Sequence, residues 1–449
     1  MYVQNFINQT WRERYHTDLS EDSLTLLWSI IVSIYTIGGF IGATIGGMLS
    51  VKLGRKGALL ANNIFALMAA LLMGLSYPTG VFELLIIGRL LSGMNAGIGI
   101  CVQPQYLGEI ASTALRGAVG MGTSVFLTFG ILSAQVIGLK ELLGREEYWP
   151  FLLSTTCIPA FLQLLILPWF PESPRYLLID RGDVEGCKKA LKQLHGAGCD
   201  AQWGDIEKER SNSRDFQAKK PWELFADRSL RWQLFTIILL NTAQQLNGIN
   251  AIYFYSGYLF RQSGIPNDKI QYATVGTGVC ECITAFSCGL LIEYLGRKAL
   301  IAGGYTLMSI CCILFTLTLT FQTSSPVVPY LSMVCVFAFI LSFGLGPGGV
   351  TNILTTELFT QTTRPAAFTI AGSANWFSFF LISLLFPFIV IGLQQYCFLV
   401  FLVICSLMAA YILRIIPETK NKTFLEIQNE FHSSNSGKVG RANGAGTTL

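Results

Sequence analysis

Three amide side chains lie close together near the middle of the chain: Gln244, Gln245 and Asn250 fall within a stretch of seven residues. Each amide offers both hydrogen-bond donors and acceptors, so the group suits a neutral ligand that carries several hydroxyls. Gly248 falls between them and would weaken a helix at that point. The ordinary alternative is that these amides bond to neighbouring helices and hold them together.

The acidic side chain of Glu281 interrupts an otherwise uncharged stretch, residues 270–292. An ionisable group inside such a stretch is costly, so it indicates a functional position. The carboxylate could accept hydrogen bonds from hydroxyls, bind a cation or pair with a basic neighbour.

Residues suited to covalent or metal chemistry are not grouped in this sequence. The twelve cysteines are scattered and mostly lie in apolar runs, and there are only three histidines. We find no nucleophile–base pair, phosphate-binding loop or metal-ligand spacing. We therefore expect no enzyme activity, no cofactor and no metal.

The elements that position these residues must be membrane-spanning helices. The 449 residues are 52% hydrophobic and 13% charged, whereas soluble domains carry about 25% charged residues. Since a spanning helix needs roughly 20 apolar residues, the uncharged stretches that qualify are residues 24–51, 57–82, 90–108, 117–139, 149–171, 232–260 and 270–292. Residues 299–356 and 365–413 are long enough for two spans each. The sequence predicts an all-α membrane protein with about eleven spans.

Charge predicts the orientation. Basic residues are more frequent on the side of the membrane that holds the C-terminus, which places the C-terminus in the cytoplasm and the N-terminus outside. The sequon Asn8-Gln9-Thr10 would then lie outside, where Asn8 could be glycosylated. The net charge of +4 is too balanced to indicate nucleic acid as a partner.

Two charged motifs recur in the two halves of the chain. Residues 53–56 (Leu-Gly-Arg-Lys) recur as residues 295–298, and the pair Glu109 and Arg116 recurs as Glu357 and Arg364. Matching displacements of this kind indicate a parallel repeat, as in two-bundle secondary transporters. We expect Glu109 to pair with Arg116, and Glu357 with Arg364, across the cytoplasmic mouth. The alternative is that these charges only anchor the topology, since exposed pairs contribute little.

A set of motifs in order along residues 1–430 resembles the sugar-porter branch of the major facilitator superfamily. Within it, the chain is most similar to the animal facilitative glucose and fructose transporters. The motifs are Pro104-Gln105-Tyr106-Leu107-Gly108-Glu109, Pro171-Glu172-Ser173-Pro174-Arg175-Tyr176, Gln244-Gln245-Leu246-Asn247-Gly248-Ile249-Asn250, Gly346-Pro347-Gly348, Arg364-Pro365-Ala366-Ala367 and Pro417-Glu418-Thr419-Lys420.

The resemblance implies two helical bundles around a central cavity that opens alternately to either side. It assigns sugar contacts to Gln244, Gln245, Asn250, Trp376, Glu281, Asn352 and Ile131. It assigns gating to Tyr253, Tyr255, Gly346, Pro347 and Gly348. It also implies a cytoplasmic latch made of Arg55, Glu109, Arg116, Glu172, Arg175, Arg297, Glu357 and Arg364.

Several positions depart from the pattern that the glucose carriers show. Ser124 stands where they usually have glutamine, Gly344 replaces an acidic residue, and Glu281 stands where an asparagine commonly contacts sugar; Asn352 and Phe379 also differ. The resemblance therefore implies facilitated transport of a hexose, fructose or glucose, through the plasma membrane, with the departures favouring fructose. The alternatives are a proton-coupled sugar carrier, a urate or organic-anion carrier, and a non-transporting sugar sensor.

These interpretations divide the chain into five parts. We expect an extracellular segment (1–23), a five-span bundle (24–171), a cytoplasmic loop with short helices at 183–195 and from Pro221 (172–231), a six-span bundle (232–416) and a cytoplasmic tail (417–449). The family has twelve spans, and this chain begins within what resembles the first extracellular loop, so we expect a truncated isoform or an incomplete gene model. Arg89, at the outer part of the third span of this chain, would then lack the polar partner that relatives have on the missing first helix, at a cost of at least about 2.5 kcal/mol.

Overall fold

The computed structural model describes residues 2–196, 199–212, 218–262, 265–321, 324–423, 426–427 and 429–430. Within these ranges every regular element is helical. Ten spans are continuous and apolar enough to cross a membrane. In the first half they are α2 (Glu21–Lys52), α3 (Arg55–Thr79), α4 (Phe82–Ile110), α5 with α6 (Arg116–Gly120, Gly122–Ile137), and α7 with α8 and η1 (Trp149–Ser154, Cys157–Ile166, Leu167–Trp169). In the second half they are α14 (Ile270–Leu295), α15 (Arg297–Thr320), α16 with α17 (Val328–Leu345, Pro347–Leu358), α18 (Arg364–Leu393) and α19 (Cys397–Ile415).

The eleventh expected span is present as two shorter helices. Helix α12 (Arg231–Leu246) and helix α13 (Ile249–Gln262) follow one another with a break at Gly248. Gly248 has a φ of +98°, a backbone conformation that other residues rarely adopt. The predicted weak point in this helix is therefore confirmed.

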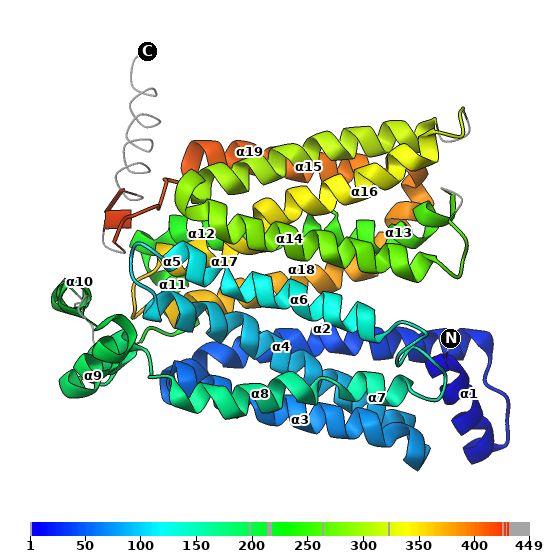
Figure 1. Ribbon diagram of the computed structural model, residues 1–449, viewed down its shortest axis with the longest axis horizontal. Coiled ribbons are helices and arrows are strands. Elements are labelled where there is room, and N and C mark those ends of the chain that lie inside the picture. Colours follow the sequence, from blue (N-terminus) through cyan, green and yellow to red (C-terminus); the bar gives the residue numbers. More distant parts are fainter. Residues whose placement is uncertain are drawn as a thin grey trace.

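The two halves of the chain form two groups of helices that pack side by side. Figure 1 shows α2 to α8 gathered on one side and α12 to α19 on the other. Helices α2 and α18, and helices α6 and α14, are the main contacts between the groups. Gly39 permits the close approach of α2 to α18, because a Cβ atom there would overlap the ring of Trp376.

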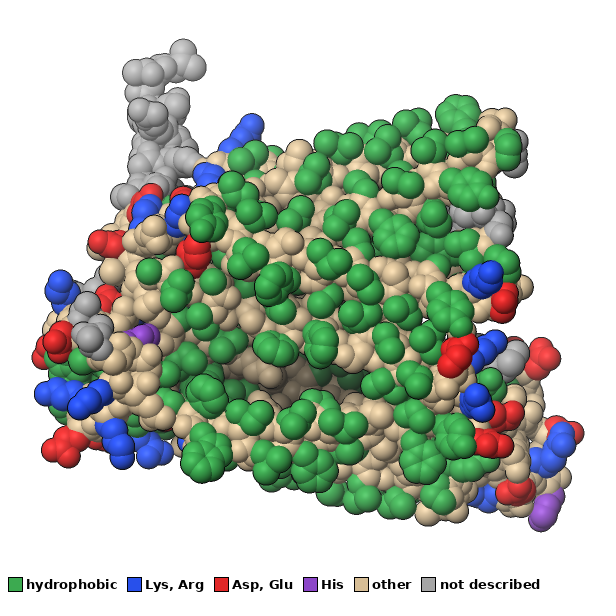
Figure 2. Space-filling view, in the orientation of Figure 1, with side chains coloured by type: hydrophobic (Ala, Val, Ile, Leu, Met, Phe, Trp, Pro, Cys, Tyr) green, Lys and Arg blue, Asp and Glu red, His purple; other side chains and the backbone are tan. Residues whose placement is uncertain are grey.

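The surface is organised as a membrane would require. In Figure 2, hydrophobic side chains cover the middle of the face, and the charged side chains lie at its two ends. Large apolar side chains such as Phe126, Leu165 and Tyr294 are more than half exposed on the surface of the molecule. Lipid, rather than water, is the solvent that such a surface suits.

The loop between the two halves, residues 172–231, contains the two helices that the sequence predicted. Helix α9 (Val184–His195) begins after Asp183, whose carboxylate accepts the backbone N–H of Gly186, and helix α11 spans Pro221–Ala226. Its described part also contains helices that were not predicted: the π-helix η2 (Tyr176–Asp180), helix α10 (Cys199–Asn212) and the 3-10 helix η4 (Arg228–Leu230).

The N-terminal segment contains a helix that hydropathy did not reveal. Helix α1 (Tyr2–Tyr15) buries Phe6, Ile7 and Thr10 on one face. The ring of Phe6 packs 5.5 Å from that of Trp149. A short apolar face on a charged helix gives too weak a signal for a hydropathy rule built for spans. Residues 431–449 of the expected tail lie outside the described residues.

Candidate functional site

The predicted amides form a continuous series of hydrogen bonds between the two sides of the break in α12–α13. Asn250 Nδ2 donates to Gln245 Oε1 at 3.0 Å, and Gln245 Nε2 donates to Asn375 Oδ1 at 3.2 Å. Asn375 Nδ2 donates to Gln244 Oε1 at 3.0 Å. The structure thus brings the three predicted amides together, with Asn375 between them.

Gln244 also joins this series to the hinge in the α16–α17 span. Its Nε2 donates to the carbonyl oxygens of Pro347 and Gly348, both at 3.1 Å. Helix α16 ends before Gly346 and α17 begins at Pro347, so the predicted hinge residues do lie at a break between helices. Because proline has no N–H to continue the helix, the break leaves polar backbone groups at this point.

A cavity of about 540 Å³ lies beside the amides. Gln245, Asn375 and Trp376 line it from the second half of the chain, and polar residues of the first half face them. The latter are Asn62, Asn63, Asn95, Gln103, Thr123, Thr156 and Gln163. Its size is within the usual range of small-molecule pockets, about 300–1,000 Å³. The cavity is also lined by Phe126 of α6 and by Ala160 of α8, and Figure 2 shows a hollow between these parts of the surface.

Three polar atoms of residues that line this cavity are buried without a hydrogen-bond partner in the described part of the chain. They are Nε1 of Trp376, Oγ1 of Thr123 and Oδ1 of Asn62. Buried polar groups are normally satisfied, and an orphaned one requires an explanation. Since these atoms are themselves buried, a ligand in the cavity would reach them only after the neighbouring side chains move.

The sequence interpretation missed Asn375 and the amides of the first half. Asn375 directly precedes Trp376, which was predicted, and it is 3% exposed. Amides within apolar stretches are a detectable signal, but the same residues can serve to hold helices together. Asn62 and Asn95 do so here, since each Nδ2 donates to the other's carbonyl oxygen at 3.0 Å.

The remaining predicted sugar contacts do not line the cavity. Glu281 lies on α14, 4% exposed, and its Oε2 accepts a hydrogen bond of 2.6 Å from the hydroxyl of Tyr253. Asn352 lies on α17, where its carbonyl oxygen accepts from Thr356, and Ile131 lies on α6. The side chain of Tyr255, a predicted gate, lies outside the described residues.

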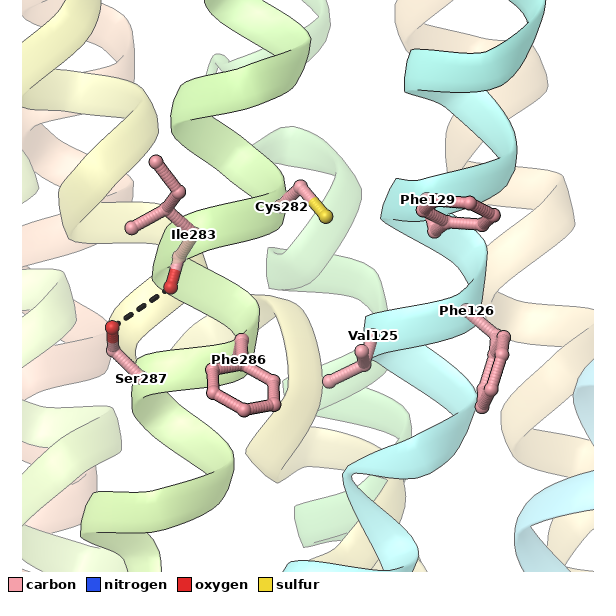
Figure 3. A pocket seen from close by; sticks show the side chains of 7 residues that line it. All are labelled: Val125, Phe126, Phe129, Cys282, Ile283, Phe286 and Ser287. Carbon is pink, nitrogen blue, oxygen red and sulfur yellow. Dashed lines mark hydrogen bonds between the residues drawn. The ribbon is translucent and has the colours of Figure 1, made fainter.

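An apolar groove of about 420 Å³ lies between α6 and α14. Figure 3 shows Phe126 and Phe129 on α6 opposite Phe286 and Cys282 on α14. The hydroxyl of Ser287 donates to the carbonyl of Ile283 at 2.8 Å. Because that hydroxyl is already bonded within its own helix, the groove offers little to a polar ligand.

The two halves each hold a cluster of buried charges at the end that the sequence places in the cytoplasm. In the N-terminal charge cluster (Arg55, Glu109, Glu172, Ser173), Arg55 Nε lies 2.9 Å from Glu109 Oε2. In the C-terminal charge cluster (Arg297, Glu357, Glu418, Thr419), Arg297 Nη2 lies 3.1 Å from Glu357 Oε1. A hydroxyl of each cluster donates to the same carboxylate, Ser173 to Glu109 and Thr419 to Glu357.

A second carboxylate in each cluster caps the start of a helix. Glu172 accepts the backbone N–H groups of Arg55 and Lys56, and Glu418 accepts those of Arg297 and Lys298. A carboxylate at a helix N-terminus is favourable because the first N–H groups have no partner within the helix. Glu418 was not among the predicted latch residues.

The predicted pairing within each half has the wrong partners. Glu109 is bound by Arg55 and by Arg364 of the other half, at 3.2 Å, and Glu357 is bound by Arg297. Arg116 donates to the carbonyl of Lys422 at 3.4 Å and to Thr113. The repeat identified the charged residues but not which element lies across from each.

The loop reinforces the N-terminal cluster. Arg175 binds Asp205 at 2.9 Å and Glu209, both on α10, and Glu209 also accepts the backbone N–H of Gln361. Asp180 accepts from Arg55 at 3.0 Å. Burial raises the pKa of Asp180 above its ordinary value, and the neighbouring Arg55 opposes that shift.

The structure modifies two sequence-based expectations for the end of the molecule that was predicted to face outside: glycosylation of Asn8 and the lack of a partner for Arg89. Asn8 lies inside helix α1 with Thr10 buried, which differs from the surface loop that a glycosylation sequon favours. Arg89 has partners on α2: its Nε lies 3.4 Å from the carbonyl of Ile31, and its guanidinium lies 4.7 Å from the ring centre of Tyr35. A face-on aromatic ring and a carbonyl offset part of the expected cost.

Comparison with known proteins gives consistent matches along almost the whole chain. Residues 2–431 match the family described as "Sugar (and other) transporter". The human protein "Solute carrier family 2, facilitated glucose transporter member 11" is 47% identical over 436 residues, which is 97% of this chain and 88% of that protein. Human member 5 of the same series is 45% identical, with 97% and 87% covered. Mouse member 9 is 46% identical, with 97% and 81% covered.

Solved structures share the fold at low sequence identity. A double tryptophan mutant of XylE superposes with a TM-score of 0.84 at 22% identity, covering 96% of this chain and 95% of that one. An inward-open conformation of the xylose transporter XylE from E. coli gives 0.66 at 20% identity, covering 96% of each chain. The fold is that of the major facilitator superfamily, as the sequence predicted.

Proposed function

Since the chain belongs to the sugar (and other) transporter family, we propose that it carries a hexose, fructose or glucose, by facilitated and uncoupled transport. It is an integral membrane transporter and not an enzyme. The observation that carries the proposal is the cavity lined by amides and Trp376, because amide side chains offer both donors and acceptors to a neutral polyhydroxyl ligand. The relatives support it, since the similar human and mouse proteins are named as facilitated glucose transporters.

The uncoupled mechanism rests on the absence of charge in the cavity. None of the described residues that line it is acidic, basic or histidine. Glu281 is buried and bound by Tyr253 rather than facing the cavity. A proton-coupled carrier is the second candidate, because the XylE structures include a proton:xylose symporter on the same fold.

The cytoplasmic charge clusters support an alternating-access cycle. In the conformation described, Arg364 of the second half binds Glu109 of the first, and both side chains are fully buried. We propose that this contact closes the cytoplasmic side, that residues 24–171 and 232–416 move as the two units, and that the contact separates when the inner side opens. We place the protein in the plasma membrane with its C-terminus in the cytoplasm.

The coupling mechanism is tested by imposing ion gradients on vesicles that contain the purified protein. Labelled sugar should equilibrate and not accumulate, with or without a proton or sodium gradient. Accumulation against the sugar gradient, dependent on the imposed ion gradient, would show that the carrier is coupled.

The sugar site is tested by Gln245→Ala. Gln245 lines the cavity and bonds Asn250 and Asn375, so its loss should weaken sugar binding by roughly 1–3 kcal/mol. Uptake kinetics measure the change, and Lys208→Ala, on the exposed face of α10, is the control that should leave uptake unchanged. Unaltered affinity in Gln245→Ala at normal surface expression would remove this residue from the site.

A further inference from the structure

The outer half of the broken span, helix α13, is joined to α12 by a sharp turn. Gly248 has a φ of +98°, and a Cβ atom there would lie 2.6 Å from the ring of Phe401. The side chain of Asn247 accepts the backbone N–H of Ile249 at 2.9 Å and so caps the start of α13. Helix α13 therefore begins as a separate unit, whose orientation depends on its contacts with α14 and α16.

One of those contacts is a hydrogen bond to a buried carboxylate. Tyr253 of α13 donates to Oε2 of Glu281 at 2.6 Å, and Glu281 is 4% exposed in the middle of α14. Among the described residues, the hydroxyl of Tyr253 is the side-chain group that forms a hydrogen bond with Glu281. Inside a protein a hydrogen bond is electrostatically stronger than in water. A carboxylate buried in a span is also costly without a partner, so both helices are held to this arrangement.

The same helix face carries the first amide of the sugar site. Asn250 lies three residues before Tyr253, and residues three apart on a helix are neighbours on one face. Asn250 donates to Gln245, which bonds Asn375, and the latter two line the cavity. A rotation of α13 about Gly248 that broke the Tyr253 bond would therefore also displace Asn250.

We propose that Glu281 is a positioning residue: by holding Tyr253 it fixes α13 against α14, and so fixes Asn250 in the amide series that faces the sugar. This inference rests on the proposed function for its effect on transport, but the tether itself does not. Glu281 thus acts without touching sugar, in a different way from the sugar contact that the sequence resemblance implied.

The test uses Tyr253→Phe, which removes only the donor hydroxyl, with Tyr305→Phe as its matched control. Tyr305 is a fully buried tyrosine on α15 whose hydroxyl has no partner among the described residues. Hydrogen exchange of α13 backbone amides is measured by mass spectrometry on the full-length protein in lipid nanodiscs. Exchange should be about ten-fold faster in Tyr253→Phe and unchanged in Tyr305→Phe. Glu281→Gln, which keeps an acceptor oxygen, should show a smaller increase.

A double variant tests whether the two substitutions act through the Tyr253–Glu281 hydrogen bond or destabilise α13 independently of each other. If Tyr253 and Glu281 act through one bond, Tyr253→Phe combined with Glu281→Gln should exchange no faster than Tyr253→Phe alone. Additive increases in α13 exchange, or unchanged exchange in Tyr253→Phe, would overturn the tether.

Transport kinetics test the positioning role. Tyr253→Phe should raise the KM for the transported hexose about three- to ten-fold with little change in the maximal rate, and Glu281→Gln should restore much of the affinity that Glu281→Leu loses. Faster α13 exchange with an unchanged KM would overturn the positioning role. If the unaltered protein carries no hexose, the proposed function fails, and the exchange experiment still decides on the tether.

Discussion

The N-terminal and C-terminal charge clusters share one plan and differ in their additional contacts. Arg55 binds Glu109 in the first cluster as Arg297 binds Glu357 in the second, with a capping glutamate and a hydroxyl in equivalent places. The glycines that precede Arg55 and Arg297 have matching φ values of +83° and +86°. The repeat in the sequence is therefore a repeat of structure.

The difference lies in the additional partners of each cluster. Glu109 also binds Arg364, which comes from the other half of the chain, whereas Arg297 also binds Glu293 of its own half at 2.9 Å. Both clusters contact the other half, but in different ways: Glu109 forms an ion pair with Arg364, whereas Glu293 accepts the backbone N–H of Ala118 at 3.0 Å. Similar local sequences can therefore serve different roles, because the role depends on which element faces the motif.

Glu109→Gln should have the largest effect. It leaves Arg55 and Arg364, both fully buried, without their shared carboxylate, and removing one partner of a buried pair costs about 3–5 kcal/mol. Glu357→Gln should cost less, because Glu357 pairs with one buried arginine whereas Glu109 pairs with two. Thermal unfolding in detergent compares the two variants. Equal losses of stability would contradict the difference between the clusters.

Arg364→Lys should shift the balance of conformations. Lysine keeps the charge but cannot reproduce the guanidinium's contacts with Glu109 and with the carbonyls of Thr356 and Phe359. A loss of about 1.4 kcal/mol would raise the cytoplasm-open population about ten-fold.

Distances between spin labels at exposed positions on the two halves, residues 52 and 295, measure that population. Arg116→Lys is the matched change in the other half and should open the cytoplasmic side less. Equal opening in both variants would show that the halves contribute alike.

The smallest effect is expected at the edges of the two clusters, where both have an equivalent, partly buried lysine. Lys56 and Lys420 each donate to a backbone carbonyl at the edge of a cluster, at 2.8 Å and 2.9 Å. Their replacement by alanine should change stability by no more than about 0.5 kcal/mol in either half. A substantially larger loss for one of them in thermal unfolding would reveal an asymmetry that these contacts do not show.

The spans and their break could be predicted from the sequence, because length, hydropathy and glycine act locally. The repeat likewise identified the charged residues of both clusters. The partner of Glu109 could not be predicted, since Arg364 is distant in sequence and only the packing of the two halves brings it near. Asn375 was missed for a related reason: an amide in an apolar helix is equally suited to ligand binding and to helix packing.

The central claim, facilitated transport of a hexose, is tested most directly by uptake into vesicles that contain the purified protein and no ion gradient. Labelled fructose, glucose and urate should be compared side by side, with empty vesicles as the background. The account predicts saturable uptake of fructose, glucose or both, reduced in Gln245→Ala, and no uptake of urate above background. Uptake of urate without either hexose, or of none of the three, would contradict it.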